Sequence, residues 1–247
     1  MKLFAISDLH LPGGGTKAMD VFGPHWVGHF DKIKQDWIAR VSEGDAVLMP
    51  GDFSWAMRLA DALPDLRAVG ALPGRKVILR GNHDYWWNAL GQLCAALPPS
   101  ITALQNNATV IRGEDADYDG QSGAVQEIVI AGSRGWNYPD PLAPSYADDD
   151  KIYKRELIRL DMSIRDAKRR APRAPLIIMT HYPPFRDRYE PSPMTAIINE
   201  SGAVACVYGH LHGESGFSIG ASRTIHGVTY HQVSCDGLGF KLKEIQL

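Results

Sequence analysis

The chain has 247 residues, of which 45% are hydrophobic and 22% are charged. A chain of this length and composition can bury a sizeable core, which excludes an intrinsically disordered protein. Its 26 basic and 28 acidic residues give a net charge of −2, so charge alone does not indicate binding to a nucleic acid or another polyanion. No apolar run approaches the roughly 18 residues that a membrane span needs, so we expect no membrane-spanning helix.

The three cysteines predict a reducing environment. Their odd number and the absence of a Cys-x-x-Cys pair argue against a disulfide framework. The opening apolar run ends after residue 6, which is too short for the core of a signal peptide. We therefore expect a cytoplasmic location.

Short apolar runs and helical periods alternate along the chain. The runs predict strands at residues 3–6, 46–49, 76–79, 109–111, 127–131, 176–179, 203–208, 229–233 and 241–245, and they suit strands buried on both faces. Helical periods predict helices at about 30–41, 59–72, 86–97 and 148–170. This order favours a layered α/β or α+β fold with helices outside the sheets.

One segment has an unusual charge. Residues 113–150 contain nine acids against a single base, Arg134. We expect one domain over residues 1–247, with 113–150 as a partial cap near the mouth of the site.

Polar side chains that can ligate metals follow several predicted strands. The carboxyl ends of strands in open α/β sheets are where ligands bind, so these side chains are expected to form one cluster. They are Asp8, His10, Asp52, Asn82, His181, His210 and His212. Imidazoles and carboxylates without thiolates suit Mn, Fe, Zn or Co. Seven donors exceed the need of one ion, whereas two ions about 3.5–4 Å apart can clamp the oxygens of a displacement at phosphorus.

The order of these residues resembles the calcineurin-like metallophosphoesterases. The resemblance spans residues 8–212 and rests on Asp8-Leu9-His10, Gly51-Asp52, Gly81-Asn82-His83-Asp84, His181 and Gly209-His210-Leu211-His212. Residues 51–56 and 80–87 look most like a bacterial branch of predicted phosphohydrolases. The resemblance implies a two-sheet β-sandwich flanked by helices, and a dinuclear metal centre.

It also implies a role for each matching position. Asp8, His10 and His212 would bind one ion, Asn82, His181 and His210 the other, and Asp52 would bridge the two. His83 would donate the proton to the leaving group, with Asp84 orienting it. The reaction expected is hydrolysis of a phosphomonoester or a small phosphodiester by direct attack of a metal-bridging hydroxide.

Substrate contacts are predicted less directly. Arginines suit phosphate oxygens and aromatic rings suit an organic group, which makes Arg80, Arg134, Trp55 and Trp86 the candidates. A nuclease is the alternative enzyme, but the net charge of −2 and the acidic segment disfavour a nucleic acid partner. A non-catalytic metal-binding interaction module is the other alternative. A small phosphorylated substrate is the partner we expect.

Overall fold

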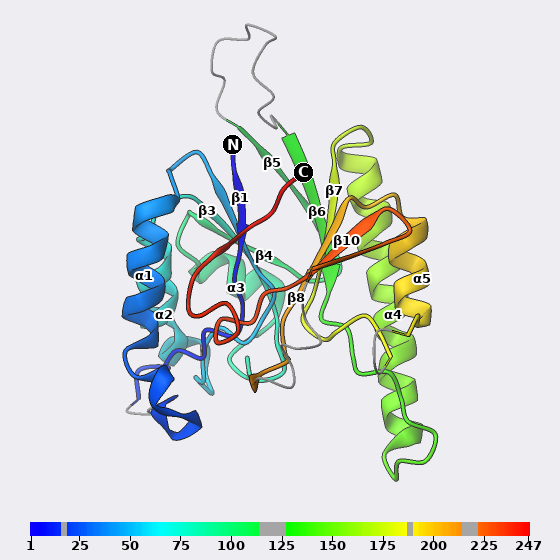
Figure 1. Cartoon of the computed structure of the whole chain (residues 1–247), viewed down its shortest axis with the longest axis horizontal. Helices are drawn as coiled ribbons and strands as arrows, with labels where there is room; N and C mark the ends of the chain where they lie inside the picture. Colours follow the sequence, from blue (N-terminus) through cyan, green and yellow to red (C-terminus); the bar gives the residue numbers. More distant parts are fainter. Residues whose placement is uncertain (16–18, 114–126, 187–189, 214–221) are drawn as a thin grey trace, which may run out of the picture.

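The computed structural model describes residues 1–15, 19–113, 127–186, 190–213 and 222–247. Two sheets lie beside each other, and helices cover their outer faces (Figure 1). The predicted two-sheet α/β sandwich is therefore confirmed. Among the described helices, none combines the length and the apolar character that a bilayer span requires.

The first sheet has five strands, and four of them are parallel. Its order is β11 (Lys243–Glu244), β1 (Leu3–Ala5), β2 (Ala46–Met49), β3 (Arg75–Leu79) and β4 (Ile101–Leu104). The pairs β1–β2, β2–β3 and β3–β4 are parallel, and β11 pairs with β1 in the antiparallel sense. The carboxyl ends of the parallel strands therefore lie at one edge of the sheet.

The second sheet has six strands with a parallel centre. Its order is β5 (Ala108–Arg112), β6 (Glu127–Ser133), β7 (Leu176–Thr180), β8 (Ala205–Tyr208), β10 (Val228–Gln232) and β9 (Arg223–Ile225). Strands β6, β7, β8 and β10 are parallel, while β5 and β9 are antiparallel to their neighbours.

Helices cover the outer face of each sheet. Figure 1 shows α1 (His29–Arg40) and α2 (Leu59–Gly70) outside the first sheet, and α4 (Tyr146–Arg170) and α5 (Pro193–Glu200) outside the second. The short helix α3 (Leu90–Ala96) precedes β4.

Alternation along the strands divides the apolar residues into three clusters. In β1, Leu3 and Ala5 belong to the cluster shared by the two sheets, and Phe4 belongs to the cluster that contains Ile33 and Trp37 of α1. Successive side chains of a strand point to opposite faces, so a strand between a helix layer and another sheet must be apolar on both faces. This is why continuous apolar runs identified these strands.

Some elements differ from the prediction. Strands β4 and β9 and helix α5 were not predicted, and the helix expected at 86–97 begins only at Leu90. Trp86 precedes that helix in a turn, where its indole N–H donates to the carboxylate of Asp84 at 3.0 Å. Helix α5 is capped by Ser192, the residue before it, whose hydroxyl accepts from the N–H groups of Met194 and Thr195. Such a cap is a local signal that favours a short helix.

The acidic segment is divided among several elements. Residues 114–126 of the predicted cap lie outside the described residues, 127–133 form β6, and α4 begins at residue 146. Only residues 134–145 form a described loop beyond the carboxyl end of β6. The cap stays a prediction. Among the described residues, only this loop is left to form it.

The two sheets converge at the edge where their parallel strands end. The N–H of Ser7, beyond β1, donates to the carbonyl of Val233, beyond β10, at 2.8 Å. A parallel bridge joins Ser7 to Ser234 next to this bond. Loops from both sheets therefore meet at one place.

Candidate metal centre

Each predicted metal ligand follows a strand at this edge. Asp8 and His10 follow β1, Asp52 follows β2 and Asn82 follows β3, all in the first sheet. The second sheet contributes three histidines after β7 and β8, which are His181, His210 and His212.

The backbone at four of these seven positions is strained. Asp8, His10, Asp52 and His210 have φ angles of 58°, 46°, 53° and 74°, in the left-handed region that residues with a Cβ rarely adopt. Each such residue costs about 1–2 kcal/mol. Strain of this kind persists where the surrounding structure imposes it, commonly at functional sites.

The first cluster consists of Asp8, His10 and His212. Ligand atoms of these three residues all lie within 4.8 Å of one another. The Nε2 atoms of His10 and His212 are 3.3 Å apart, and Nε2 of His212 is 3.5 Å from Oδ1 of Asp8. The structure therefore brings together the three residues predicted for the first ion.

The second cluster centres on the amide of Asn82. Its Oδ1 lies 2.6 Å from Nε2 of His181 and 2.9 Å from Nδ1 of His210. The structure thus brings together the three residues predicted for the second ion.

Asp52 lies between the two clusters. Its Oδ2 is 3.7 Å from Nε2 of His10, and its Oδ1 is 3.6 Å from Nε2 of His181. Each carboxylate oxygen therefore faces an imidazole of a different cluster, which is the geometry that a bridging ligand needs. Asp8 also approaches both clusters, because it lies within 4.8 Å of Asp52 and His181 as well.

The charges of the site favour a cation. Burial and repulsion from Asp8 and Asp84 raise the pKa of Asp52 to about 9, so its ionised form needs added positive charge. Burial alone would lower the pKa of His212, but its hydrogen bonds to Asp236 and Asp8 outweigh burial and raise that pKa to about 10. The carboxylates of Asp8 and Asp236 thus stabilise a proton on His212. A metal bound by this histidine would displace that proton. Burial also lowers the pKa of His10 to about 3, which leaves a neutral imidazole suited to ligation.

Asp236 is a further functional residue that was not predicted from the sequence. Its Oδ1 lies 3.0 Å from Nδ1 of His212, and its Oδ2 accepts from the N–H of Gly213 at 3.0 Å. A carboxylate behind a ligating histidine fixes the tautomer and orientation of the ring. The available signal was its position soon after the predicted strand 229–233, at the same edge as the other ligands.

His83 and Asp84 lie beside the clusters in different surroundings, and their roles stay predictions. Nε2 of His83 is 4.0 Å from Oδ2 of Asp52, and its ring lies 4.4 Å from that of Trp55. The carboxylate of Asp84 is fully buried and accepts from the indole of Trp86 and from the backbone N–H groups of Asp52, Phe53, Ser54 and Gly81. Asp84 therefore ties the loop after β2 to the loop after β3, which makes it a positioning residue for both.

The two tryptophans predicted to contact substrate differ in their exposure, and the role of Trp55 stays a prediction. Trp55 stacks on the imidazole of His10 at 4.8 Å between ring centroids and lines a pocket at the site. Trp86 is 0% exposed, and it packs beneath the loops against Phe53 and Trp87. The prediction that Trp86 contacts substrate is wrong, because no surface of its ring is accessible.

Both predicted arginines lie near the second cluster. Arg134 follows β6, and its carbonyl accepts from the N–H groups of His181 and Tyr182. Its guanidinium lies over the ring of Trp136, 4.8 Å from the centroid. Arg80 directly precedes Gly81, and its buried Nε atom has no partner among the described residues. Their role as phosphate contacts stays a prediction.

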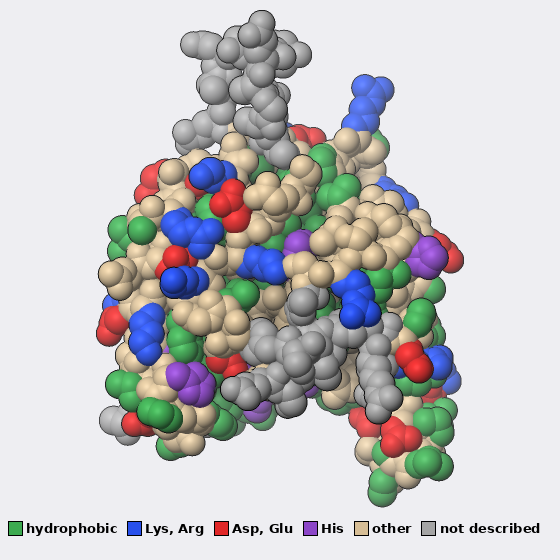
Figure 2. Space-filling model, viewed as in Figure 1, with side chains coloured by type: hydrophobic (Ala, Val, Ile, Leu, Met, Phe, Trp, Pro, Cys, Tyr) green, Lys and Arg blue, Asp and Glu red, His purple; other side chains and the backbone are tan. Residues whose placement is uncertain are grey.

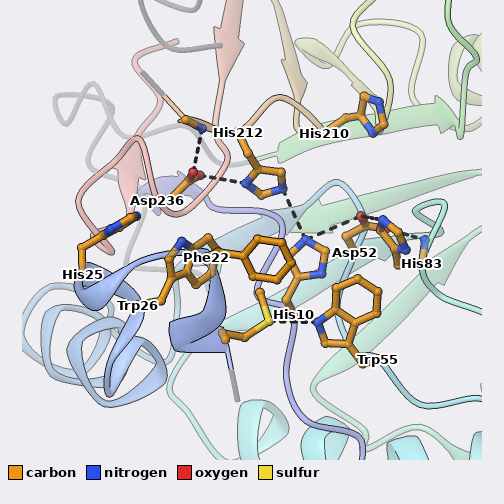
Figure 3. Close-up of a pocket in the computed structure, with 12 residues that line it drawn as sticks. His10, Phe22, His25, Trp26, Asp52, Trp55, His83, His210, His212 and Asp236 are labelled. Atoms are coloured by element: carbon orange, nitrogen blue, oxygen red, sulfur yellow. Dashed lines mark hydrogen bonds and ion pairs between the residues drawn. The ribbon is translucent and has the colours of Figure 1, made fainter. Parts of the chain in front are cut away.

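A pocket of about 340 Å³ opens beside the first cluster. Figure 3 draws Asp52 and His83 on one side of it, and Phe22 and Trp26 on the other. The polar atoms of the site therefore face an apolar wall.

The family of the chain follows from a sequence comparison. The model of the calcineurin-like phosphoesterase family matches residues 1–214. The chain belongs to the calcineurin-like phosphoesterase family and is a metal-dependent phosphoesterase. The comparison with curated protein sequences gives no match.

One solved structure shares the fold at low identity. The phosphopantetheinyl hydrolase of Mycobacterium tuberculosis is 16% identical, with a TM-score of 0.58 over 99% of this chain and 95% of that one. A protein of unknown function from Aquifex aeolicus, AQ665, is 15% identical, with a TM-score of 0.47 over 98% of this chain and 95% of that one.

Proposed function

We propose that this phosphoesterase uses two divalent ions to hydrolyse a phosphomonoester or a small phosphodiester by direct attack of water. The observation that supports it best is the position of Asp52, whose two oxygens face imidazoles of different clusters. Asp8, His10 and His212 would hold one ion, and Asn82, His181 and His210 the other. The donor set of imidazole, carboxylate and amide suits Mn, Fe, Zn or Co. When bound, such ions polarise phosphoryl oxygens and lower the pKa of coordinated water.

The chain's own residues supply the remaining functions. His83 lines the pocket next to Asp52 and is 34% exposed, so it can protonate the oxygen of the leaving group. Arg80 and Arg134 would bind phosphoryl oxygens from the side of the second cluster.

The charge distribution disfavours a nuclease. On the face shown in Figure 2, the basic and acidic side chains of the described residues are interspersed and form no broad basic tract. A phosphate polymer needs such a tract, because most of its affinity comes from neutralising backbone charge. A metal-binding module without activity is disfavoured by the retention of every predicted ligand and of His83. Three free thiols, two of them buried, support a location in the reducing cytoplasm.

The direct test compares two chromogenic esters. We expect the Mn²⁺-loaded protein to hydrolyse p-nitrophenyl phosphate or bis-p-nitrophenyl phosphate, and chelation followed by added Mn²⁺ to remove and restore the activity. Cleavage of bis-p-nitrophenyl phosphate without cleavage of DNA would identify a small-diester enzyme. Hydrolysis of neither ester with any of the four metals would contradict the proposal.

A further inference from the structure

An apolar wall stands directly beside the first metal cluster. It comes from the segment that follows β1, which forms two short 3₁₀ helices, η1 (Met19–Phe22) and η2 (Pro24–Trp26). Met19, Phe22 and Trp26 from these helices line the same pocket of about 340 Å³ as His10, His83 and His212. This volume is within the range of small-molecule sites, about 300–1,000 Å³.

The wall is held in place by its own contacts. The Trp26 ring lies 5.2 Å from His29 and 5.1 Å from Phe240, and Trp26 is only 3% exposed. A ring nitrogen of His29 is 2.9 Å from the carbonyl of Leu9, between the ligands Asp8 and His10. The indole N–H of Trp55 is 3.0 Å from the sulfur of Met19. The wall is therefore joined to the strand end that carries the metal ligands.

Phe22 differs from the other members of the wall in its exposure. It is 58% exposed, although it lines the pocket and its ring centroid is 6.5 Å from that of Trp26. Contact with an apolar group of a ligand would remove this surface from water, which is favourable by about 25 cal/mol per Å². Figure 3 shows Phe22 and Trp26 on the same side of the pocket.

The lining of the pocket disfavours one kind of ligand group. Its described lining residues include no lysine or arginine. The carboxylate of Asp236 is already occupied by His212 and Gly213. Away from the metal cluster, a second phosphate, as in a nucleoside diphosphate, would find no lysine or arginine among the described lining residues, whereas an uncharged apolar group meets aromatic rings and a thioether.

We propose that this pocket binds the organic group of the substrate, and that it selects phosphoesters with an aromatic or extended apolar group. The inference rests on the proposed function for the phosphoryl site and adds the class of substrate. His83, the proposed proton donor to the leaving group, lines the same pocket. The organic group bound in the pocket is therefore the leaving group of the reaction. Phe22 is then a specificity-determining residue.

The test measures binding of two phosphonates that cannot be hydrolysed. Propylphosphonate and 3-phenylpropylphosphonate have the same charged group and differ in the phenyl ring. We expect the Mn²⁺-loaded protein to bind the phenyl compound at least about tenfold more tightly, by calorimetry and as a competitive inhibitor of p-nitrophenyl ester hydrolysis. Phe22→Ala should reduce this preference to about threefold or less.

Val21→Ala is the matched control. Val21 precedes Phe22 in the same 3₁₀ helix and is 76% exposed, and it does not line the pocket. This variant should keep the full preference. Equal binding of the two phosphonates, or a preference that Phe22→Ala leaves intact, would overturn the inference. Calorimetry separates the two proposals, because a preference without hydrolysis would contradict only the proposed function, and hydrolysis without a preference only the inference.

Discussion

At the scale of single residues, His83 differs from the metal-binding histidines in its surroundings. His181 is 0% exposed, and its Nε2 lies 2.6 Å from Oδ1 of Asn82, whereas the side chain of His83 is 34% exposed and its ring centroid lies 4.4 Å from that of Trp55. A buried imidazole that faces other ligands suits metal binding, and an accessible one beside the pocket suits proton transfer to a substrate.

His83→Ala should therefore retain the metal ions and lose the proton donor. We expect esters with alkyl leaving groups to slow by about 10²–10⁴-fold, because an alkoxide needs a proton and p-nitrophenolate hardly does. Steady-state rates on both kinds of ester, with elemental analysis of the variant, check this. Equal slowing on both would argue against His83 as the acid.

Asp236 offers a second test at this scale. Asp236→Ala removes the partner of Nδ1 of His212, and we expect the affinity for Mn²⁺ to fall about 10–100-fold in a calorimetric titration. Asp236→Asn is the matched control, since its amide oxygen can still accept from the ring and should preserve most of the affinity. An alanine variant that binds Mn²⁺ as tightly as the original protein would exclude this role.

The limits of sequence reasoning are visible in particular residues. Asp8, Asp52 and His181 were identifiable because each directly follows a strand that reads as an apolar run. Asp236 also follows a predicted strand, but its contact with His212 depends on the pairing of β10 with β8, which the sequence does not show. Trp86 was assigned to the substrate because sequence proximity does not show on which side of a loop a ring lies.

At the scale of elements, the loops after β2 and β3 pack too closely for a side chain on Gly81. A Cβ there would overlap the N and Oδ1 atoms of Asp52. The same Oδ1 accepts a hydrogen bond from the N–H of His83 at 2.8 Å. The glycine is therefore a requirement of the bridging position, and its neighbours Asn82 and His83 depend on the same packing.

Gly81→Ala should displace Asp52 and reduce both metal content and activity. A displacement of about 1 Å can cost about 100-fold in rate, which is the loss we expect. The control is Gly91→Ala in α3, where a Cβ meets no atom within 4 Å. That change should leave the metal content intact and raise the free energy of unfolding by about 0.5–1 kcal/mol. Normal metal content and turnover in Gly81→Ala would show that the loop tolerates the methyl group.

Local sequence patterns predicted the buried elements and missed the short ones. Strands buried between a helix layer and the other sheet have continuous apolar runs, as in β2 and β7. The short strand β9 is mostly exposed and therefore has no apolar run. Helix α5 spans only 8 residues, which is too few for a helical repeat of apolar residues to be recognised. Their formation depends on pairing with β10 and on the Ser192 cap.

At the scale of the whole molecule, the site exists because two sheets converge at one edge. The first sheet supplies Asp8, His10, Asp52 and Asn82, and the second supplies the remaining three histidines. Neither sheet alone completes either cluster, since His212 faces Asp8 and His181 faces Asn82 across the sandwich. Binding of the ions would thus link the two sheets and stabilise the folded chain by mass action.

The most direct measurement is anomalous scattering from crystals of the Mn²⁺-loaded protein. The account predicts two Mn²⁺ peaks about 3.5–4 Å apart. The Asp52 carboxylate should lie between them, with Asp8, His10 and His212 around one ion and Asn82, His181 and His210 around the other. A single peak, or two peaks with Asp52 bound to neither, would contradict it.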